Sequence, residues 1–212
     1  MNLTIKVCGM REQENILQIA SCDIDILGFI LYEKSARFIG YDFDSQIIAS
    51  CSKKTAGVFV NHPIEYVIQK QQTYLFDFLQ IHGNESPEYC KELQQQTNAY
   101  IIKAFLIDEN FSDTLLQKYS PYCDYFLFDT KTEVYGGSGK KFNWNMLHSM
   151  NINKPFFLSG GITPNDIESI VDFKHSLLFG IDINSKFELQ PALKNVNSVH
   201  TFAQQIKTHQ KK

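Results

Sequence analysis

The chain has 212 residues, of which 43% are hydrophobic, and a formal net charge of −3. This slightly acidic balance argues against general binding to nucleic acid or to membrane surfaces. No apolar run approaches the ~20 residues that span a bilayer, and the first residues lack the basic segment and apolar stretch of a signal peptide, so we expect a cytoplasmic location.

Eight apolar runs along the chain predict eight β-strands. Most of these runs are continuously apolar rather than alternating, which is typical of parallel strands that are covered on both faces. In chain order the expected strands are Leu3–Cys8, Ile24–Leu31, Gly57–Asn61, Phe76–Ile81, Tyr100–Phe105, Tyr125–Asp129, Phe156–Ser159 and Leu177–Asp182.

Segments with helical spacing separate these runs. Ser86 and Thr163 each precede a proline, and such a pair favours the start of a helix because proline suits its first position. The expected helices include Arg11–Cys22, Ser45–Cys51, Glu88–Gln96, Asp166–Val171 and Val196–Ile206.

Eight successive βα units predict an α/β fold, and specifically a single (β/α)8 TIM barrel. No linker, low-complexity segment or composition shift divides the chain, so we expect one catalytic domain over residues 1–212. An open doubly wound sheet is the alternative, but it requires an unusually long row of strands. The length lies near the short end for such barrels, so we expect tight loops.

In a barrel of this kind the catalytic groups lie at the carboxyl ends of the strands. Those ends, taken in order, predict one polar mouth with a thiol, two carboxylates, a lysine and a histidine. The residues concerned are Cys8, Tyr32, Asn61, Gln80, His82, Lys103, Asp129, Ser159, Gly160, Gly161 and Asp182.

Cys8 is the side chain on which the functional interpretation depends. Taken alone, a cysteine at the end of a strand is more often a small buried apolar residue than a catalyst. Lys6 shares its face of the strand, and an ammonium beside the thiol would favour the thiolate. The five cysteines are widely spaced, so we expect neither a disulfide framework nor a metal site.

Paired glycines follow the seventh strand. The backbone N–H groups of Gly160 and Gly161 can approach an anion closely, and a helix start follows them. Together with Asp182, Asn184 and Ser185, which close the eighth strand, they predict a phosphate site. Turn glycines without a ligand are the alternative.

The stretch Tyr135–Lys140, which includes Gly137, is a second glycine-rich segment and follows the sixth strand. It does not match the P-loop pattern, because the required spacing before Lys-Ser/Thr is absent. We interpret it as a lid that closes over substrate, with a plain surface loop as the alternative.

Asp129 and Arg37 are the charged candidates of the mouth. Asp129 ends an apolar strand, where desolvation raises a carboxyl pKa and suits a general acid, although capping a loop is the alternative. Arg37 follows the second strand, and its planar fork suits a carboxylate, whereas a solvated charged loop is the simpler interpretation.

Taken together, these segments resemble the phosphoribosylanthranilate isomerases, a family of tryptophan biosynthesis. The resemblance runs in family order over nearly the whole chain. It rests on Lys6-Val7-Cys8-Gly9-Met10, Gly28-Phe29 with Lys34-Ser35-x-Arg37, Gly57-Val58-Phe59-Val60-Asn61, Gln80-Ile81-His82-Gly83, Ile102-Lys103-Ala104, Phe128-Asp129-Thr130-Lys131, the loop from Tyr135 to Trp144, and Leu158-Ser159-Gly160-Gly161-Ile162.

The resemblance implies an Amadori rearrangement of N-(5-phospho-β-D-ribosyl)anthranilate to 1-(2-carboxyphenylamino)-1-deoxy-D-ribulose 5-phosphate. In this family a cysteine after the first strand is the general base and an aspartate after the sixth is the general acid, so these roles fall on Cys8 and Asp129. The expected substrate-binding residues are Arg37, which corresponds to the arginine that contacts the anthranilate carboxylate, Gln80, His82, Gly137, Gly160, Gly161, Asp182, Asn184 and Ser185.

This activity implies no metal and no organic cofactor. The expected partner is the small-molecule substrate, with no nucleic acid and no membrane, and the chain is expected to act as a monomer or a homodimer. One motif departs from the family: Asn184 stands where members usually have serine, and Lys186 where they have glycine. Without the glycine a close backbone contact with the phosphate is blocked, and we expect the charge of Lys186 to replace it.

Two alternatives remain at this point. The histidine-pathway isomerase performs the same rearrangement, but it uses an aspartate where this chain has Cys8, and no half-chain repeat is visible. A catalytically silent phosphosugar-binding protein would lose the acid or the base, whereas both Cys8 and Asp129 are present.

Overall fold

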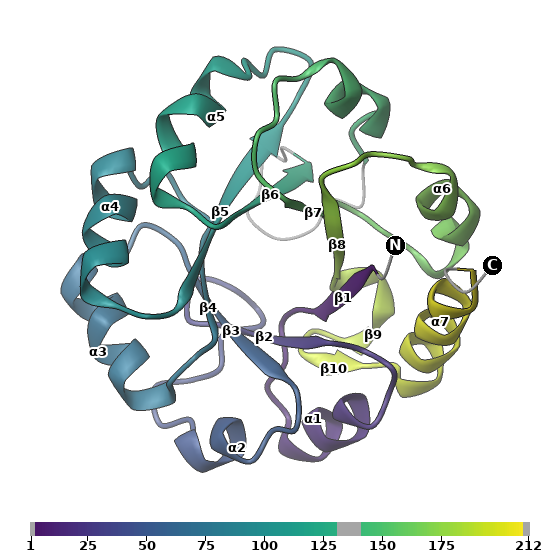
Figure 1. Ribbon diagram of the computed structural model, residues 1–212. Helices are drawn as coiled ribbons and strands as arrows, with labels where there is room; N and C mark the ends of the chain where they lie inside the picture. Colours follow the sequence, from purple (N-terminus) through teal and green to yellow (C-terminus); the bar gives the residue numbers. More distant parts are fainter. Residues whose placement is uncertain (1–2, 131–140, 210–212) are drawn as a thin grey trace.

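Eight parallel strands close into a barrel in the order β1 to β8, with β8 pairing back onto β1. The structure is a computed structural model, and it describes residues 3–130 and 141–209. Figure 1 looks along the barrel, whose strands lie inside a ring of helices. The strands are β1 (Thr4–Val7), β2 (Ile26–Ile30), β3 (Lys54–Phe59), β4 (Phe78–Ile81), β5 (Tyr100–Ile107), β6 (Tyr125–Thr130), β7 (Phe156–Leu158) and β8 (Leu178–Ile183).

The outer ring contains α-helices and short 3-10 helices. The α-helices are α1 (Gln13–Ala20), α2 (Ser45–Ala49), α3 (Ile64–Tyr74), α4 (Pro87–Gln96), α5 (Thr114–Tyr119), α6 (Ile167–Asp172) and α7 (Val196–His209). The 3-10 helices are η1 (Ser120–Tyr122), η2 (Trp144–Ser149), η3 (Pro164–Asp166) and η4 (Ser185–Phe187).

The closed barrel and its eight strands confirm the predicted fold class. Strand β3 begins at Lys54, three residues before the predicted Gly57, because Lys54 and Thr55 pair with β2 despite their polar side chains. The predicted helix starts also hold, since Ser86 accepts a hydrogen bond from the Tyr89 N–H and Thr163 accepts one from the Asn165 N–H.

The sixth βα unit differs from the others in the type of its helix. Within the described residues between β6 and β7, the helical element is the 3-10 helix η2. One further feature was not predicted, an antiparallel hairpin after β8 formed by β9 (Glu188–Gln190) and β10 (Leu193–Lys194). Figure 1 shows this hairpin beside β1, near α1 and α7.

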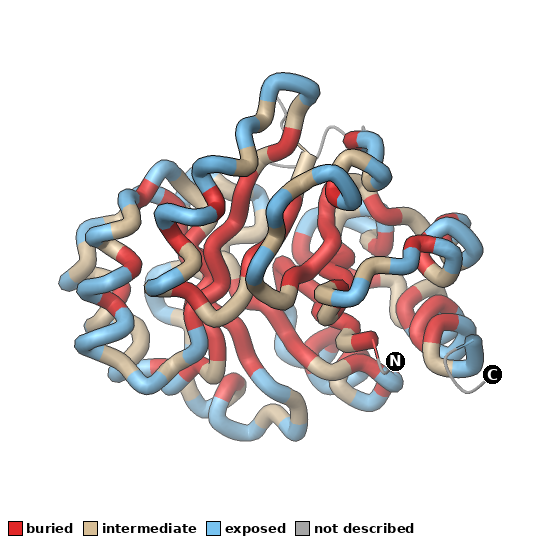
Figure 2. The backbone as a smooth tube through the Cα atoms, turned by 45° about the horizontal axis from the view of Figure 1, so that its top comes forward, coloured by how far each residue is buried: buried red, intermediate tan, exposed pale blue. Residues whose placement is uncertain are grey.

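Two apolar layers hold the barrel together. The larger layer lies between the strands and the helices, and it gives the strands the continuous burial seen in Figure 2. The smaller layer fills the interior of the barrel and consists of Ile26, Ala56, Phe78, Ile102, Ala104, Leu127 and Phe157. Because burial of apolar surface is the main favourable term in folding, these layers give the strand ends a rigid support.

Above the small interior layer, the barrel contains a buried ion pair. Lys6 on β1 and Asp182 on β8 occupy paired positions of adjacent strands, and Lys6 Nζ lies 2.9 Å from Asp182 Oδ1. Their side chains are 0% and 5% exposed. Two buried charges of opposite sign tolerate this position only because each neutralises the other.

We expect Lys6→Met to lower the free energy of unfolding by about 3–5 kcal/mol, because it leaves the Asp182 carboxylate buried without its partner. Urea denaturation measures this loss. The matched control is Lys54→Met, which breaks the Lys54–Asp77 pair, whose side chains are 59% and 37% exposed. That substitution is expected to cost less than about 1 kcal/mol. Equal losses in the two variants would contradict the role given to the buried pair.

Candidate active site

The thiol of Cys8 lies at the carboxyl end of β1, directly above the buried ion pair. The backbone N–H of Cys8 donates to the carbonyl of Ile183 at 2.9 Å, which fixes the chain at this point against β8. Cys8 itself is only 4% exposed. The structure therefore places the predicted base at the mouth of the barrel and shields it from water.

Burial raises the pKa of the Cys8 thiol above its ordinary value. The ammonium of Lys6 opposes this effect, as sequence reasoning anticipated, but the carboxylate of Asp182 offsets part of its influence. Lys194, a second cation near the thiol, also favours the thiolate. The balance keeps Cys8 mainly as the thiol, with the two ammonium groups ready to stabilise the thiolate when it forms.

Gly28 provides the space that Cys8 occupies. A Cβ added at Gly28 on β2 would lie 3.0 Å from Cys8 Sγ and 3.2 Å from Lys6 Nζ. Any larger residue would push the thiol away from the ammonium. This contact explains why a glycine belongs in the middle of an otherwise apolar strand.

Asp129 lies near the end of β6, and His82 faces it from the end of β4. His82 Nε2 is 3.5 Å from Asp129 Oδ2, and Gln80 Nε2 is 2.7 Å from His82 Nδ1. When the Gln80 amide donates to Nδ1, the ring proton is on Nε2 and points toward the carboxylate. The other oxygen, Asp129 Oδ1, accepts the N–H of Thr130 at 2.7 Å.

The paired glycines after β7 pack against the end of β6. Gly160 and Gly161 have φ values of 87° and 70°, a region that favours glycine. A Cβ on Gly160 would lie 2.6 Å from the backbone nitrogen of Thr130 and 3.0 Å from Asp129 Oδ1. The glycine turn therefore packs directly against the end of β6 and fixes the position of Asp129.

Arg37 comes from the loop between β2 and α2, and it forms a two-pronged ion pair with Glu188. Arg37 Nε lies 2.9 Å from Glu188 Oε1, and Arg37 Nη2 lies 2.6 Å from Oε2. Lys194 Nζ donates to the same carboxylate at 2.6 Å and to Asn184 Oδ1 at 2.6 Å. Sequence reasoning missed Glu188 and Lys194, because strands of two or three residues carry no periodic signal.

Lys103 does not lie at the mouth, and this expectation was wrong. It pairs with Ile81, the outward neighbour of Gln80, so its side chain leaves the barrel on the helix side. There Lys103 Nζ donates to the carbonyl of Gly83 at 2.7 Å and approaches Glu85 Oε2 at 3.4 Å. Its role is to hold the loop that follows His82.

The remaining predicted residues have mixed placements. Asp182 lies below the mouth as the partner of Lys6, Asn184 accepts from Lys194, and Ser185 begins η4. Gly137 and the predicted lid lie outside the described residues. Within residues 3–130 and 141–209, no group of three or more His, Cys, Asp or Glu side chains is placed to hold a metal ion.

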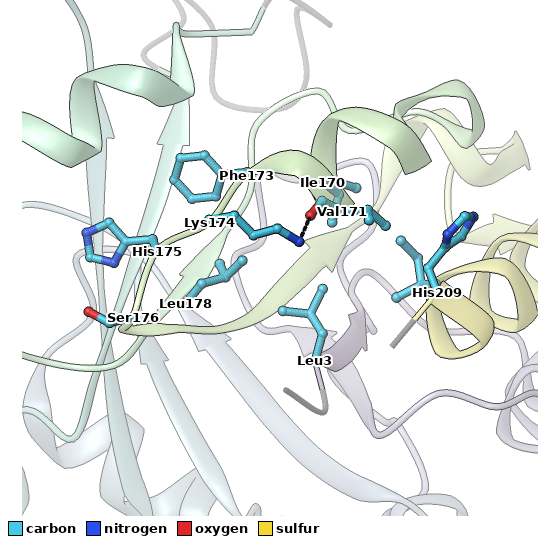
Figure 3. A pocket seen from close by; sticks show the side chains of 10 residues that line it. Leu3, Ile170, Val171, Phe173, Lys174, His175, Ser176, Leu178 and His209 are labelled. Carbon is cyan, nitrogen blue, oxygen red and sulfur yellow. Dashed lines mark hydrogen bonds between the residues drawn. The ribbon is translucent and has the colours of Figure 1, made fainter. Parts of the chain in front are cut away.

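A groove of about 480 Å³ lies at the opposite end of the barrel (Figure 3). It is bordered by Leu3 before β1, by Leu178 at the start of β8 and by residues of α6 and α7. None of its lining residues comes from the carboxyl end of a strand.

No helix of the described chain is long and apolar enough to cross a membrane.

A closed (β/α)8 barrel with a thiol, a carboxylate and an arginine around one mouth defines an enzyme of the TIM-barrel class. The model of one protein family, N-(5'-phosphoribosyl)anthranilate (PRA) isomerase, matches residues 5–205. A curated N-(5'-phosphoribosyl)anthranilate isomerase from Parabacteroides distasonis is 47% identical over 209 residues, covering 96% of this chain and 93% of the relative. The chain therefore belongs to the phosphoribosylanthranilate isomerase family.

Solved structures agree with this assignment. The crystal structure of phosphoribosyl anthranilate isomerase from Thermotoga maritima is 28% identical with a TM-score of 0.83, covering 97% of this chain and 99% of that one. Another is a phosphoribosyl anthranilate isomerase in complex with reduced 1-(o-carboxyphenylamino)-1-deoxyribulose 5-phosphate, with 25% identity, a TM-score of 0.79 and the same coverage.

Alkylation by iodoacetamide across pH tests the environment of Cys8. We expect the midpoint of its alkylation to lie above that of a peptide spanning residues 4–12, because burial disfavours the thiolate. Peptide mass spectrometry distinguishes Cys8 from the other four cysteines. A midpoint at or below that of the peptide would show that the two ammonium groups outweigh burial, contrary to this description.

Proposed function

We propose that the chain catalyses the rearrangement of N-(5-phosphoribosyl)anthranilate to 1-(2-carboxyphenylamino)-1-deoxyribulose 5-phosphate in tryptophan biosynthesis. The observation that carries the proposal is the position of Cys8 and Asp129 at the ends of β1 and β6 in a barrel of this family. These are the places where the family has its base and its acid.

The reaction requires two proton transfers to begin. Asp129, when protonated, donates its proton to the ring oxygen of the ribose, and the C1–O bond breaks to leave an iminium ion. The thiolate of Cys8 then removes the proton from C2, which the adjacent iminium makes acidic. The resulting enaminol takes a proton at C1 and loses the proton of its C2 hydroxyl, which gives the aminoketose. Every step is a proton transfer, so the mechanism requires neither a metal nor an organic cofactor.

Binding at both ends of the substrate would place the ribose between acid and base. Arg37 would hold the anthranilate carboxylate, and Gly160, Gly161 and Ser185 would hold the phosphate. A substrate fixed at its two anionic ends gains the orientation that makes proton transfer efficient. The positive φ values of the two glycines support this arrangement.

Gln80 and His82 would contact the ribose. Gln80 Oε1 is buried, and among the described residues no group donates a hydrogen bond to it. Because a buried acceptor is costly when unsatisfied, a hydroxyl of the sugar is a suitable donor. Asp182 acts on the site indirectly, from below, through its ion pair with Lys6. Asn184 also acts indirectly, through its hydrogen bond with Lys194.

The assembly proposed for the enzyme is simple. All groups of the proposed mechanism come from one chain, so residues 1–212 suffice as one catalytic domain, whether as a monomer or as a homodimer. A cytoplasmic location is consistent with a biosynthetic reaction on a small molecule.

The test is the isomerase assay with freshly prepared phosphoribosylanthranilate. We expect Cys8→Ala and Asp129→Asn each to lower kcat by about 100-fold to 10,000-fold, because each removes a proton-transfer group. For Asp129→Asn, KM should change little, since the acid acts mainly in the transition state. The exposed substitution Glu109→Gln serves as the control and should leave both constants unchanged.

Near wild-type activity in Cys8→Ala would rule out the thiolate as the base. A rise in KM alone for Asp129→Asn would assign Asp129 to binding. An inactive wild-type protein would refute the proposed substrate.

A further inference from the structure

The hairpin β9–β10 lies behind Arg37, and its carboxylate, Glu188, has no part in the mechanism described above. It contributes Glu188 at its first position and Lys194 at its last. The carboxylate of Glu188 accepts from Arg37 Nε at 2.9 Å, from Arg37 Nη2 at 2.6 Å, from Lys194 Nζ at 2.6 Å and from the Ala192 N–H at 3.2 Å. Glu188 is therefore held on every side by donors.

Lys194 anchors this arrangement inside the protein. Its side chain is 0% exposed. Its backbone N–H donates to Asn15 Oδ1 at 2.7 Å, and its carbonyl accepts from Asn15 Nδ2 at 3.0 Å, so α1 fixes the strand from behind. If Glu188 moved away, a buried ammonium would lose its counter-charge, and that loss is costly. Glu188 therefore stays in place when a ligand arrives.

The geometry of the guanidinium decides what remains available on Arg37. A guanidinium has five N–H donors in a fixed plane, and it can bind carboxylates along two different edges. Glu188 occupies the edge formed by Nε and Nη2. Among the described residues, Nη1 donates no hydrogen bond, so the Nη1–Nη2 edge is available for a second carboxylate.

Arg37 is also packed against the backbone that follows Cys8. Gly9, which directly follows Cys8, has a φ of 77°, and a Cβ there would lie 2.7 Å from Arg37 Cδ and 2.8 Å from Asn184 Oδ1. Only a glycine leaves room for the arginine stem and the amide on either side. The position of Arg37 is thus defined both by Glu188 and by the backbone that carries Cys8.

We propose that Glu188 and Lys194 are positioning residues that direct the Nη1–Nη2 edge of Arg37 toward the aryl carboxylate of the substrate. This inference rests on the proposed function, because it assumes a substrate with that carboxylate. Glu188 aligns the fork without touching the substrate, and Lys194 keeps Glu188 ionised and stationary. The hairpin is then a specificity element for aryl amines that bear a carboxylate.

Two substrates separate positioning from general support of the fold. N-(5-phosphoribosyl)anthranilate has the carboxylate. N-(5-phosphoribosyl)aniline, which is made from ribose 5-phosphate and aniline, lacks it. For Glu188→Gln we expect KM for the anthranilate substrate to rise about 10-fold while kcat changes less than about 3-fold. With the aniline substrate, kcat/KM should be unchanged, since no carboxylate is there to be aligned.

Two further variants serve as controls for this experiment. Glu168→Gln makes the same chemical change at an exposed position of α6 and should leave both substrates unaffected. Glu188→Asp keeps the charge beside Lys194, so it is expected to fold even if Glu188→Gln does not. Its shorter side chain moves the fork of Arg37, so KM should again rise for the anthranilate substrate alone.

Equal loss of kcat/KM with both substrates would overturn the proposal and assign Glu188 to stability. Unchanged constants with both would overturn it as well. If the wild-type protein converts neither substrate, the proposed function fails and the inference fails with it. An active wild type with no selective effect refutes the inference alone.

Discussion

The buried ion pair between Lys6 and Asp182 joins the first and last strands of the barrel, and the catalytic mouth is built directly above it. Breaking such a pair leaves an unpaired charge in the core, so both residues are constrained together. The pair also sets the electrostatics of Cys8. Burial alone would lower the pKa of Lys6. The carboxylate of Asp182 and the adjacent Cys8 nevertheless hold this pKa above its ordinary value, so the cation beneath the thiol persists.

This arrangement resolves an apparent conflict between shielding and reactivity. A buried thiol is a poor thiolate at rest, but a base that acts on the proton next to an iminium ion does not have to be strong. Lys6 and Lys194 provide positive charge on the side where the thiolate forms. The glycines at positions 9 and 28 make the close approach of these groups sterically possible.

The fold was largely predictable from the sequence, because parallel strands buried on both faces appear as continuous apolar runs. The direction of individual side chains was less predictable. Gln80, near the end of β4, points into the barrel, whereas Lys103, in the middle of β5, points outward, and this depends on register between strands. Glu188 and Lys194 were not identified as site residues, since β9 and β10, of three and two residues, are defined by their partners and not by their own pattern.

The central claim is that the thiolate of Cys8 removes the proton from C2. The pH dependence of kcat/KM in the Asp129→Asn variant tests it most directly, because this variant has no acid that must stay protonated, so the ratio reports the ionisation of the base in the free enzyme. In this variant the account predicts a rise with slope one through the alkaline range, with a midpoint that coincides with the midpoint of Cys8 alkylation measured in the same variant. A profile that is flat from about pH 7 to about pH 9 would contradict it, because a thiol of raised pKa would then not be the base.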